Sequence, residues 1–337
     1  MRKTAFPRAA GEGERAGKRM ETTEYRERCV QAAHAVTAEV KKAVKGKDAV
    51  IELVLLAMLA RGHILLEDIP GVGKTTMALA FSKAMQLQYN RVQFTPDVMP
   101  SDVTGYSVYQ KELGRFEYVK GAALCNLFLA DEINRTSSKT QSALLQVMEE
   151  GAVTVDLKTY ETPKPFTVIA TQNPVGYAGT QMLPESQLDR FLVRLSMGYP
   201  DAASELAILK SKSVQDASPE IRPIVGAEGI LAMQELADGV HVSDAVYQFI
   251  VALAAKTRTH ELVELGASPR GAIALLRMAK AKAFYAGREF VTPADVQQIV
   301  HPALAHRLVL KAKARVANGT AAGILNDILR DTPAPKI

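Results

Sequence analysis

The residues whose types could do chemistry begin with a glycine-rich run between an apolar stretch and a helical segment. Glycines allow a tight backbone turn that aims N–H groups at phosphate, and the first turn of a helix adds partial positive charge. In such a loop Lys74 would contact the β- and γ-phosphates of a nucleotide, and Thr75 would place its hydroxyl on Mg²⁺. The run therefore predicts an ATP-binding loop made of Pro70, Gly71, Val72, Gly73, Lys74, Thr75 and Thr76.

One position of this loop departs from the general pattern. The P-loop motif GxxxxGK[ST] begins with a glycine. That glycine would fall at position 68, where the sequence has Asp68. It is not itself expected to contact phosphate, and the later glycines and the Lys-Thr pair are present, so the prediction of a P-loop stands without it.

A second feature is a pair of carboxylates at the end of a strongly apolar run, residues 127–130. Asp131 would organise Mg²⁺ through its water shell, and Glu132 would orient and polarise the attacking water. A strand that ends in two solvated acids is common on its own, but its place downstream of a P-loop favours the catalytic interpretation. The metal site predicted here consists of Thr75 and Asp131.

A third feature is an amide at the end of another apolar run, in Thr171-Gln172-Asn173-Pro174. The Asn173 side chain could lie between the γ-phosphate and the acidic pair and hold the attacking water. An asparagine before proline is also frequent in turns that have no catalytic role. Spacing by itself leaves both interpretations open.

Short apolar runs typical of buried parallel strands alternate with helical segments in the first 200 residues. Five runs predict strands, at 63–67, 91–94, 124–130, 166–171 and 191–196. After Pro200 such runs disappear and helical patterns take over. The predicted fold class is α/β, with a three-layer P-loop core and parallel sheet over residues 24–200 and an all-helical lid domain over 201–337. Two segments inside the core, 97–120 and 151–165, alternate like β-hairpins.

The net charge of +5 is concentrated at the N-terminus, where residues 1–19 contain six basic and two acidic residues and so carry +4. The remaining +1 gives no support to sequence-independent nucleic-acid binding, which needs many basic contacts to phosphate. We expect residues 1–23 to be a disordered basic tail, with Met1 or Met20 as the start. No apolar run is long enough to span a membrane, and two isolated cysteines suit a cytoplasmic protein.

From about Val44 to Pro200 the sequence resembles the MoxR family of AAA+ ATPases. The motifs that carry the resemblance follow one order: residues 62–71 (GHILLEDIPG), 100–105 (PSDVTG), 131–136 (DEINRT), 141–145 (QSALL), 148–150 (MEE), 170–174 (ATQNP) and 185–191 (ESQLDRF). Such a series is more specific than any single motif, and Asp68 is compatible with the P-loop of this family. The helical part matches more loosely, through residues 268–270 (SPR) and the Thr292-Pro293 helix start.

The resemblance implies roles for three residues. Asn173 would be the sensor-1 residue, and Arg190 would be an arginine finger that enters the site of a neighbouring subunit. Arg270 would be the sensor-2 residue, reaching the γ-phosphate from the lid, so that ATP binds between the two domains of one subunit. Simpler interpretations are that Arg190 pairs with Asp189 or Glu185 and that Arg270 is an ordinary helix-start residue. Because the family usually forms hexameric rings, we expect a homohexamer.

The resemblance also implies a chaperone-like ATPase that remodels, matures or activates a partner protein. The partner would carry a von Willebrand factor A domain, and the service could be metal or cofactor insertion into an enzyme. The hairpins at 97–120 and 151–165 would face the pore of the ring, although both could be plain surface hairpins. Two alternatives are a nucleic-acid motor, which the nearly neutral body disfavours, and a nucleotide-gated scaffold with little turnover, for which Glu132 would have no use.

Overall fold

The computed structural model describes residues 15–173, 183–213, 220–316 and 319–336. Five strands form a parallel sheet in the order β2-β5-β8-β1-β9, so the five predicted strands and the α/β class are confirmed. Because the strands are parallel, their carboxyl ends meet at one edge of the sheet. The strands are β1 (Ile64–Glu67), β2 (Tyr89–Gln93), β5 (Leu127–Asp131), β8 (Thr167–Gln172) and β9 (Val193–Leu195).

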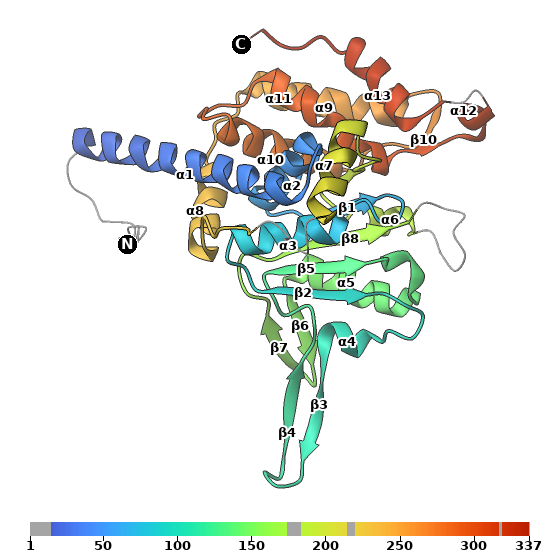
Figure 1. Cartoon of the computed structure of the whole chain (residues 1–337). Helices are drawn as coiled ribbons and strands as arrows, with labels where there is room; N and C mark the ends of the chain where they lie inside the picture. Colours follow the sequence, from blue (N-terminus) through green and yellow to red (C-terminus); the bar gives the residue numbers. More distant parts are fainter. Residues whose placement is uncertain (1–14, 174–182, 214–219, 317–318, 337) are drawn as a thin grey trace.

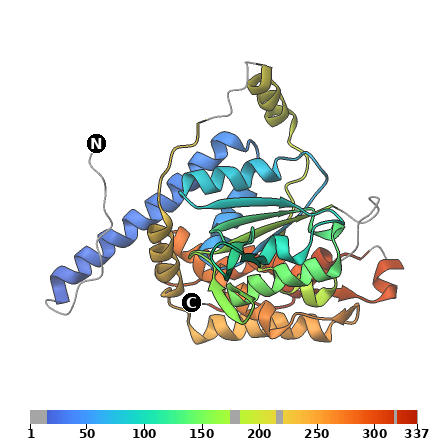
Figure 2. The ribbon, with the colours of Figure 1, turned by 90° about the horizontal axis from the view of Figure 1, so that it is seen from below.

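Helices cover both faces of the sheet (Figure 2). The alternating side chains of the buried strand β5 explain why both faces need cover. Leu127 and Leu129 belong to the larger apolar core, which also takes in α3 (Lys74–Ala84). Phe128 and Ala130 point to the opposite face and pack in a second core with α5 (Ser138–Glu150). Successive residues of a strand face opposite sides, so a fully apolar strand requires cover on both.

The N-terminal helix α1 (Arg15–Ala43) corrects the expected extent of the disordered tail. Four small or branched side chains at helical spacing, Cys29, Ala33, Val36 and Val40, are fully buried in the larger core. Once a helix is anchored in this way, adding further turns is favourable, and the chain toward Arg15 contains no proline to stop it. Residues 15–23 are therefore helical, whereas residues 1–14 lie outside the described part of the chain.

The C-terminal part is helical, as predicted, and packs beside α1 and α2 (Asp48–Leu59) (Figure 1). Its elements are α7 (Ala202–Ser213), α8 (Ala227–Asp238), α9 (Asp244–Thr259), α10 (Pro269–Tyr285), α11 (Pro293–Leu304), η2 (Ala305–Arg307), α12 (Ala312–Val316) and α13 (Ala321–Arg330). A short antiparallel ribbon of β10 (Val263–Leu265) and β11 (Val309–Leu310) was not anticipated, because runs of two or three residues show no period. None of the described helices is long and apolar enough to cross a bilayer.

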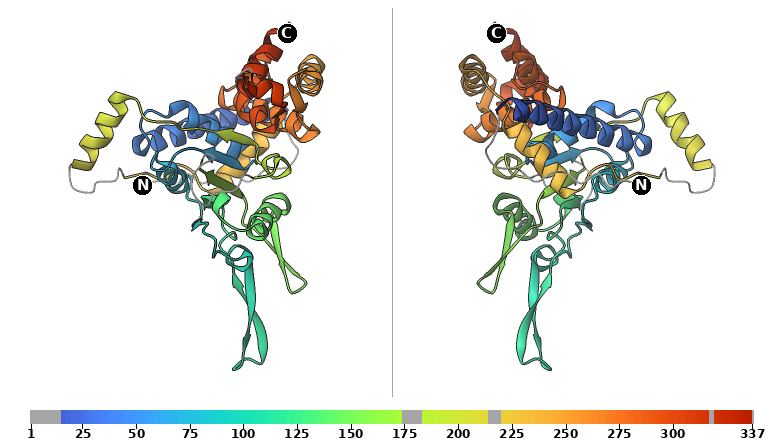
Figure 3. Two further views of the ribbon diagram at one scale, coloured as in Figure 1. Left: turned by 90° about the vertical axis from the view of Figure 1, so that its right-hand side faces the viewer. Right: turned by 90° about the vertical axis from the view of Figure 1, so that its left-hand side faces the viewer.

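Two hairpins leave the sheet on the side away from the C-terminal helices (Figures 1 and 3). The longer one joins β3 (Gly105–Gln110) to β4 (Arg115–Lys120), after the short helix α4 (Pro100–Thr104). The shorter one joins β6 (Ala152–Val155) to β7 (Lys158–Glu161). The rings of Tyr118 and Tyr160 stack at 4.0 Å and connect the two hairpins near their bases.

Candidate nucleotide site

The predicted P-loop lies between the end of β1 and the start of α3, at the carboxyl edge of the sheet. Gly71 and Gly73 have φ angles of 85° and 95°, which side-chain-bearing residues rarely adopt, and Gly73 is the N-cap of α3. A Cβ at Gly71 would meet no atom within 4 Å. The loop therefore presents open backbone at a helix N-terminus, which is the geometry that a phosphate group needs.

Lys74, the first residue of α3, is only 7% exposed, and its Nζ donates to the main-chain oxygen of Asp68 at 2.8 Å. Burial lowers the pKa of the Lys74 ammonium, and three nearby carboxylates oppose that shift. The opposing groups are Asp68, Asp131 and Glu132. The ammonium is thus held at the loop, among the acidic groups expected to act with it.

Asp68, which stands where the motif usually has its first glycine, ties the P-loop to the segment that follows β9. Its buried carboxylate accepts hydrogen bonds from the Ser196 hydroxyl at 2.8 Å, from the Gly198 N–H at 3.0 Å and from the Met197 N–H. These three donors directly follow β9, the strand that pairs with β1, and β1 leads into the P-loop. No role for Asp68 was predicted from sequence, because its partners lie about 130 residues away along the chain.

We expect Asp68→Ala to destabilise the fold by roughly 2–4 kcal/mol, because buried donors lose their acceptor. The loop should also bind ATP more weakly, since Asp68 ties it to β9. Chemical denaturation and equilibrium ATP binding would measure the two effects. Glu112→Ala, at the exposed tip of the longer hairpin, removes a carboxylate without such contacts and is the matched control. If the two variants were equally stable, Asp68 would not hold the P-loop in the way we infer.

The acidic pair lies where β5 ends, beside the P-loop. Asp131 is 9% exposed and is engaged from both sides: Arg91 Nη2 donates to its Oδ2 at 2.7 Å, and the Thr171 hydroxyl donates to its Oδ1 at 2.6 Å. Arg91 comes from β2 and Thr171 from β8, the two strands that flank β5. The neighbours that orient Asp131 therefore follow from the strand order.

Glu132 and Asn173 lie in direct contact, as the catalytic interpretation requires. Asn173 Nδ2 donates to Glu132 Oε1 at 3.1 Å, and Arg135 Nη1 pairs with Oε2 at 2.9 Å. Glu132 has a φ of 58°, a left-handed conformation that costs a non-glycine residue free energy and recurs at functional sites. The Thr171 hydroxyl accepts a hydrogen bond from the Glu132 main-chain N–H at 2.8 Å and helps to hold this conformation.

The residues proposed for Mg²⁺ fit that ion. Mg²⁺ prefers oxygen ligands and usually takes one or two from the protein while phosphates and water supply the rest. Thr75 and Asp131 offer a hydroxyl and a carboxylate beside the open P-loop. Among the described residues no group of three or more His, Cys, Asp and Glu side chains could hold a metal ion by itself. A metal bound together with ATP suits this limited set of ligands.

The two arginines assigned from the resemblance lie together, but at the opposite edge of the sheet. Arg190 precedes β9, and Arg270 lies in the first turn of α10. Both pair with Glu149 at the end of α5, where the neighbouring Met148 carbonyl contacts His63, just before β1. Because β1 spans roughly 13 Å at about 3.3 Å per residue, neither arginine reaches the P-loop of its own subunit.

The expectation was that Arg270 contacts ATP between the two domains of one subunit; in the structure Arg270 instead pairs with Glu149, beside Met148 and His63. The lid helix α10 meets the amino edge of the sheet, whereas the P-loop lies at the carboxyl edge. Within the described part of the chain Arg190 pairs with Glu149 and not with Asp189 or Glu185, the two acids suggested for it, and Asp189 pairs with Arg307 at 2.7 Å. Sequence position could not reveal this, because helix order does not say which edge of the sheet a lid covers.

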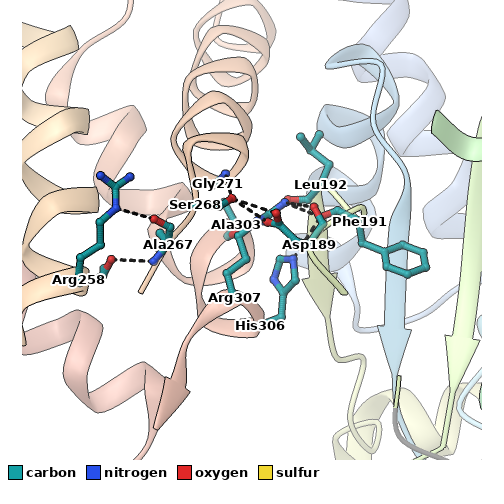
Figure 4. A network of polar contacts seen from close by, with 11 residues as sticks. Asp189, Phe191, Leu192, Arg258, Ala267, Ser268, Gly271, Ala303, His306 and Arg307 are labelled. Carbon is teal, nitrogen blue, oxygen red and sulfur yellow. Dashed lines mark hydrogen bonds and ion pairs between the residues drawn. The ribbon is translucent and has the colours of Figure 1, made fainter. Parts of the chain in front are cut away.

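A buried network fixes the segment that carries Arg190 to the start of α10 (Figure 4). The Arg307 side chain, 2% exposed, donates from Nε to the Asp189 carboxylate and from Nη1 and Nη2 to main-chain carbonyls of the same segment. Ser268, the N-cap of α10, donates to the same carboxylate at 2.9 Å. One carboxylate thus holds the positions of Arg190 and Arg270 relative to each other.

Comparisons with known proteins show the family of the chain. A family model described as "ATPase family associated with various cellular activities (AAA)" matches residues 63–193, and one for an AAA lid domain matches residues 255–328. The chain is 45% identical to YeaC of Bacillus subtilis, over 88% of this chain and 92% of that protein. It is 36% identical to Chaperone MoxR1 of Mycobacterium tuberculosis, over 89% of this chain and 81% of that protein. A crystal structure from Cytophaga hutchinsonii aligns with a TM-score of 0.87 and 36% identity, over 94% of this chain and 100% of that one.

Proposed function

Because this chain belongs to the MoxR family of AAA+ ATPases, we propose that it couples ATP hydrolysis to chaperone-like remodelling of a partner protein. The observation that carries the proposal is the division of the catalytic groups between two edges of the sheet. The phosphate loop, the acidic pair and Asn173 lie at one edge, and the arginine pair lies at the other. A complete site then needs two subunits, so that hydrolysis can be linked to the relative movement of neighbours.

Within one subunit the groups divide the work of hydrolysis. The P-loop backbone and Lys74 would bind the phosphates, and Mg²⁺ held by Thr75 and Asp131 would neutralise charge on them. Glu132, which Asn173 and Arg135 orient, would position and polarise the attacking water. Most of this catalysis is positioning together with electrostatic stabilisation, which fits a site whose side chains are already hydrogen-bonded to one another.

Arg190 and Arg270 would both act on the nucleotide of the neighbouring subunit. They line a pocket with three further arginines, Arg61, Arg277 and Arg307, and with only two carboxylates, Glu149 and Asp189. The surplus of positive charge is complementary to a triphosphate, and guanidinium groups grip phosphate oxygens in pairs. We propose a homohexameric ring, in which each interface joins the P-loop edge of one subunit to the arginine edge of the next.

The two hairpins are the part of the subunit best placed to act on a partner. Tyr106, Tyr109 and Phe116 on the longer hairpin are 49%, 50% and 69% exposed, although large apolar side chains usually avoid water. Such a surface suits an apolar segment of a protein more than a phosphate backbone. We propose that the hairpins face the pore and contact a partner with a von Willebrand factor A domain, in the service of metal or cofactor insertion into an enzyme.

The test is the ATPase rate per subunit, measured against protein concentration with the particle size determined at each point. We expect the rate per subunit to rise as rings form, and to be abolished by Lys74→Ala. A rate that does not change with assembly would contradict the shared site. A rate raised by DNA, with a steep salt dependence, would favour a nucleic-acid motor instead.

A further inference from the structure

Glu149 joins the two arginines that different parts of the fold bring to one edge. Its Oε2 forms an ion pair with Arg190 Nη1 at 2.9 Å, and its Oε1 accepts a hydrogen bond from Arg270 Nη2. Arg190 Nη1 also donates to the Leu145 carbonyl at 3.0 Å, one helical turn before Glu149 on α5. Residues four apart on a helix share a face, so α5 fixes the direction of Arg190 at two points while Glu149 bridges the two cations.

The other arginines of the pocket make the Glu149 bridge necessary to keep Arg190 and Arg270 together. Arg61 and Arg307 line the same pocket but pair with their own acids, Asp238 and Asp189. Arg277 also lines it and pairs with no carboxylate of the described residues. Without the charge of Glu149, two guanidinium groups would face each other beside a third, and their repulsion would separate them.

The exposure of the three side chains indicates what Glu149 contributes. Glu149, Arg190 and Arg270 are 44%, 32% and 46% exposed, so water screens their ion pairs and the pairs add little to folding stability. A guanidinium has five N–H donors, and the contacts to Glu149 use a single Nη of each arginine. Donors therefore remain for another acceptor while the bridge is intact.

We propose that Glu149 is a positioning residue, which holds Arg190 and Arg270 as a pair directed at the phosphates bound by the neighbouring subunit. This inference rests on the shared site of the proposed function. The new element is that Glu149, which lies far from the P-loop of its own chain, influences the rate of ATP hydrolysis in the neighbouring subunit. If the two arginines lose their positions, kcat falls more than the affinity for ATP changes.

The experiment compares full-length Glu149→Gln with Glu150→Gln, a matched control on the same turn whose exposed carboxylate contacts only Gln146 among the interactions of the described chain. We expect Glu149→Gln to assemble normally, to lower kcat about tenfold and to change KM for ATP by less than about threefold. Glu150→Gln should behave as the unaltered protein. A raised kcat, or loss of assembly, would overturn the positioning role.

Mixed rings separate a positioning role from a structural one. Glu149→Gln subunits mixed with Glu132→Gln subunits should regain activity, because some interfaces then combine an intact P-loop side with an intact arginine side. If Glu149 served its own nucleotide or its own fold, mixing would restore nothing. Arg190→Ala subunits mixed with Glu132→Gln subunits test the shared site separately. Rescue there without rescue of Glu149→Gln would refute only the role of Glu149.

Discussion

Glu132→Gln is expected to bind ATP but to hydrolyse it at least about 100-fold more slowly, the usual contribution of a positioned acid or base. Glutamine keeps the size of the side chain, and its oxygen can still accept the hydrogen bond that Asn173 donates at 3.1 Å. It lacks the negative charge that polarises water. Phosphate release under saturating ATP, measured beside equilibrium nucleotide binding, would separate the two effects.

Two comparisons make this result specific to the acidic pair. Glu150→Gln makes the same chemical change at an exposed helix position and should leave turnover unaffected. Lys74→Ala should instead lose ATP binding itself, because its buried ammonium lies at the P-loop. Turnover by Glu132→Gln within about twofold of the unaltered protein would assign water activation to another residue and would return Glu132 to the role of a solvated acid at a strand end.

The carboxyl edge of the sheet could be predicted well, because local patterns determine it. An apolar strand followed by glycines and Lys-Thr places a phosphate loop, and parallel strands bring the ends at Asp131 and Asn173 to the same edge. The contact between Asn173 and Glu132, the residue after Asp131, therefore follows from the neighbouring positions of β5 and β8 in the sheet. The partners that orient these groups, Arg91 and Thr171, were not singled out, since they depend on which strands flank β5.

The placement of the lid could not be predicted from the same patterns. Capping motifs such as Thr292 with Asp295 determine where a helix starts, and the structure contains both hydrogen bonds of that box. They carry no information on which edge of the sheet the helices cover. That placement depends on buried contacts far apart in sequence, such as Arg307 with Asp189, 118 residues away. For this reason the sequence did not reveal that Arg270 lies beside Arg190 and pairs with Glu149.

Arg190→Ala is expected to lower turnover about 10³-fold, the lower end of the effect of an arginine finger on phosphoryl transfer. The residue is held by Glu149 and by the Leu145 carbonyl at the amino edge of the sheet, where it cannot contact the phosphates of its own subunit. The ATPase rate of fully assembled protein is the measurement. ATP binding to the P-loop should persist, because Lys74 and the glycines are unchanged.

Mixing decides whether the arginine works on the neighbour. In rings assembled at random from equal amounts of Arg190→Ala and Glu132→Gln subunits, about a quarter of the interfaces would combine the intact P-loop side of the first with the intact arginine side of the second. Activity should then rise well above that of either variant alone. In verified mixed rings, activity no higher than the mean of the two variants would show that Arg190 does not act across the interface. The division of the site between two edges would then need a different explanation, such as a partner protein that supplies the missing cation.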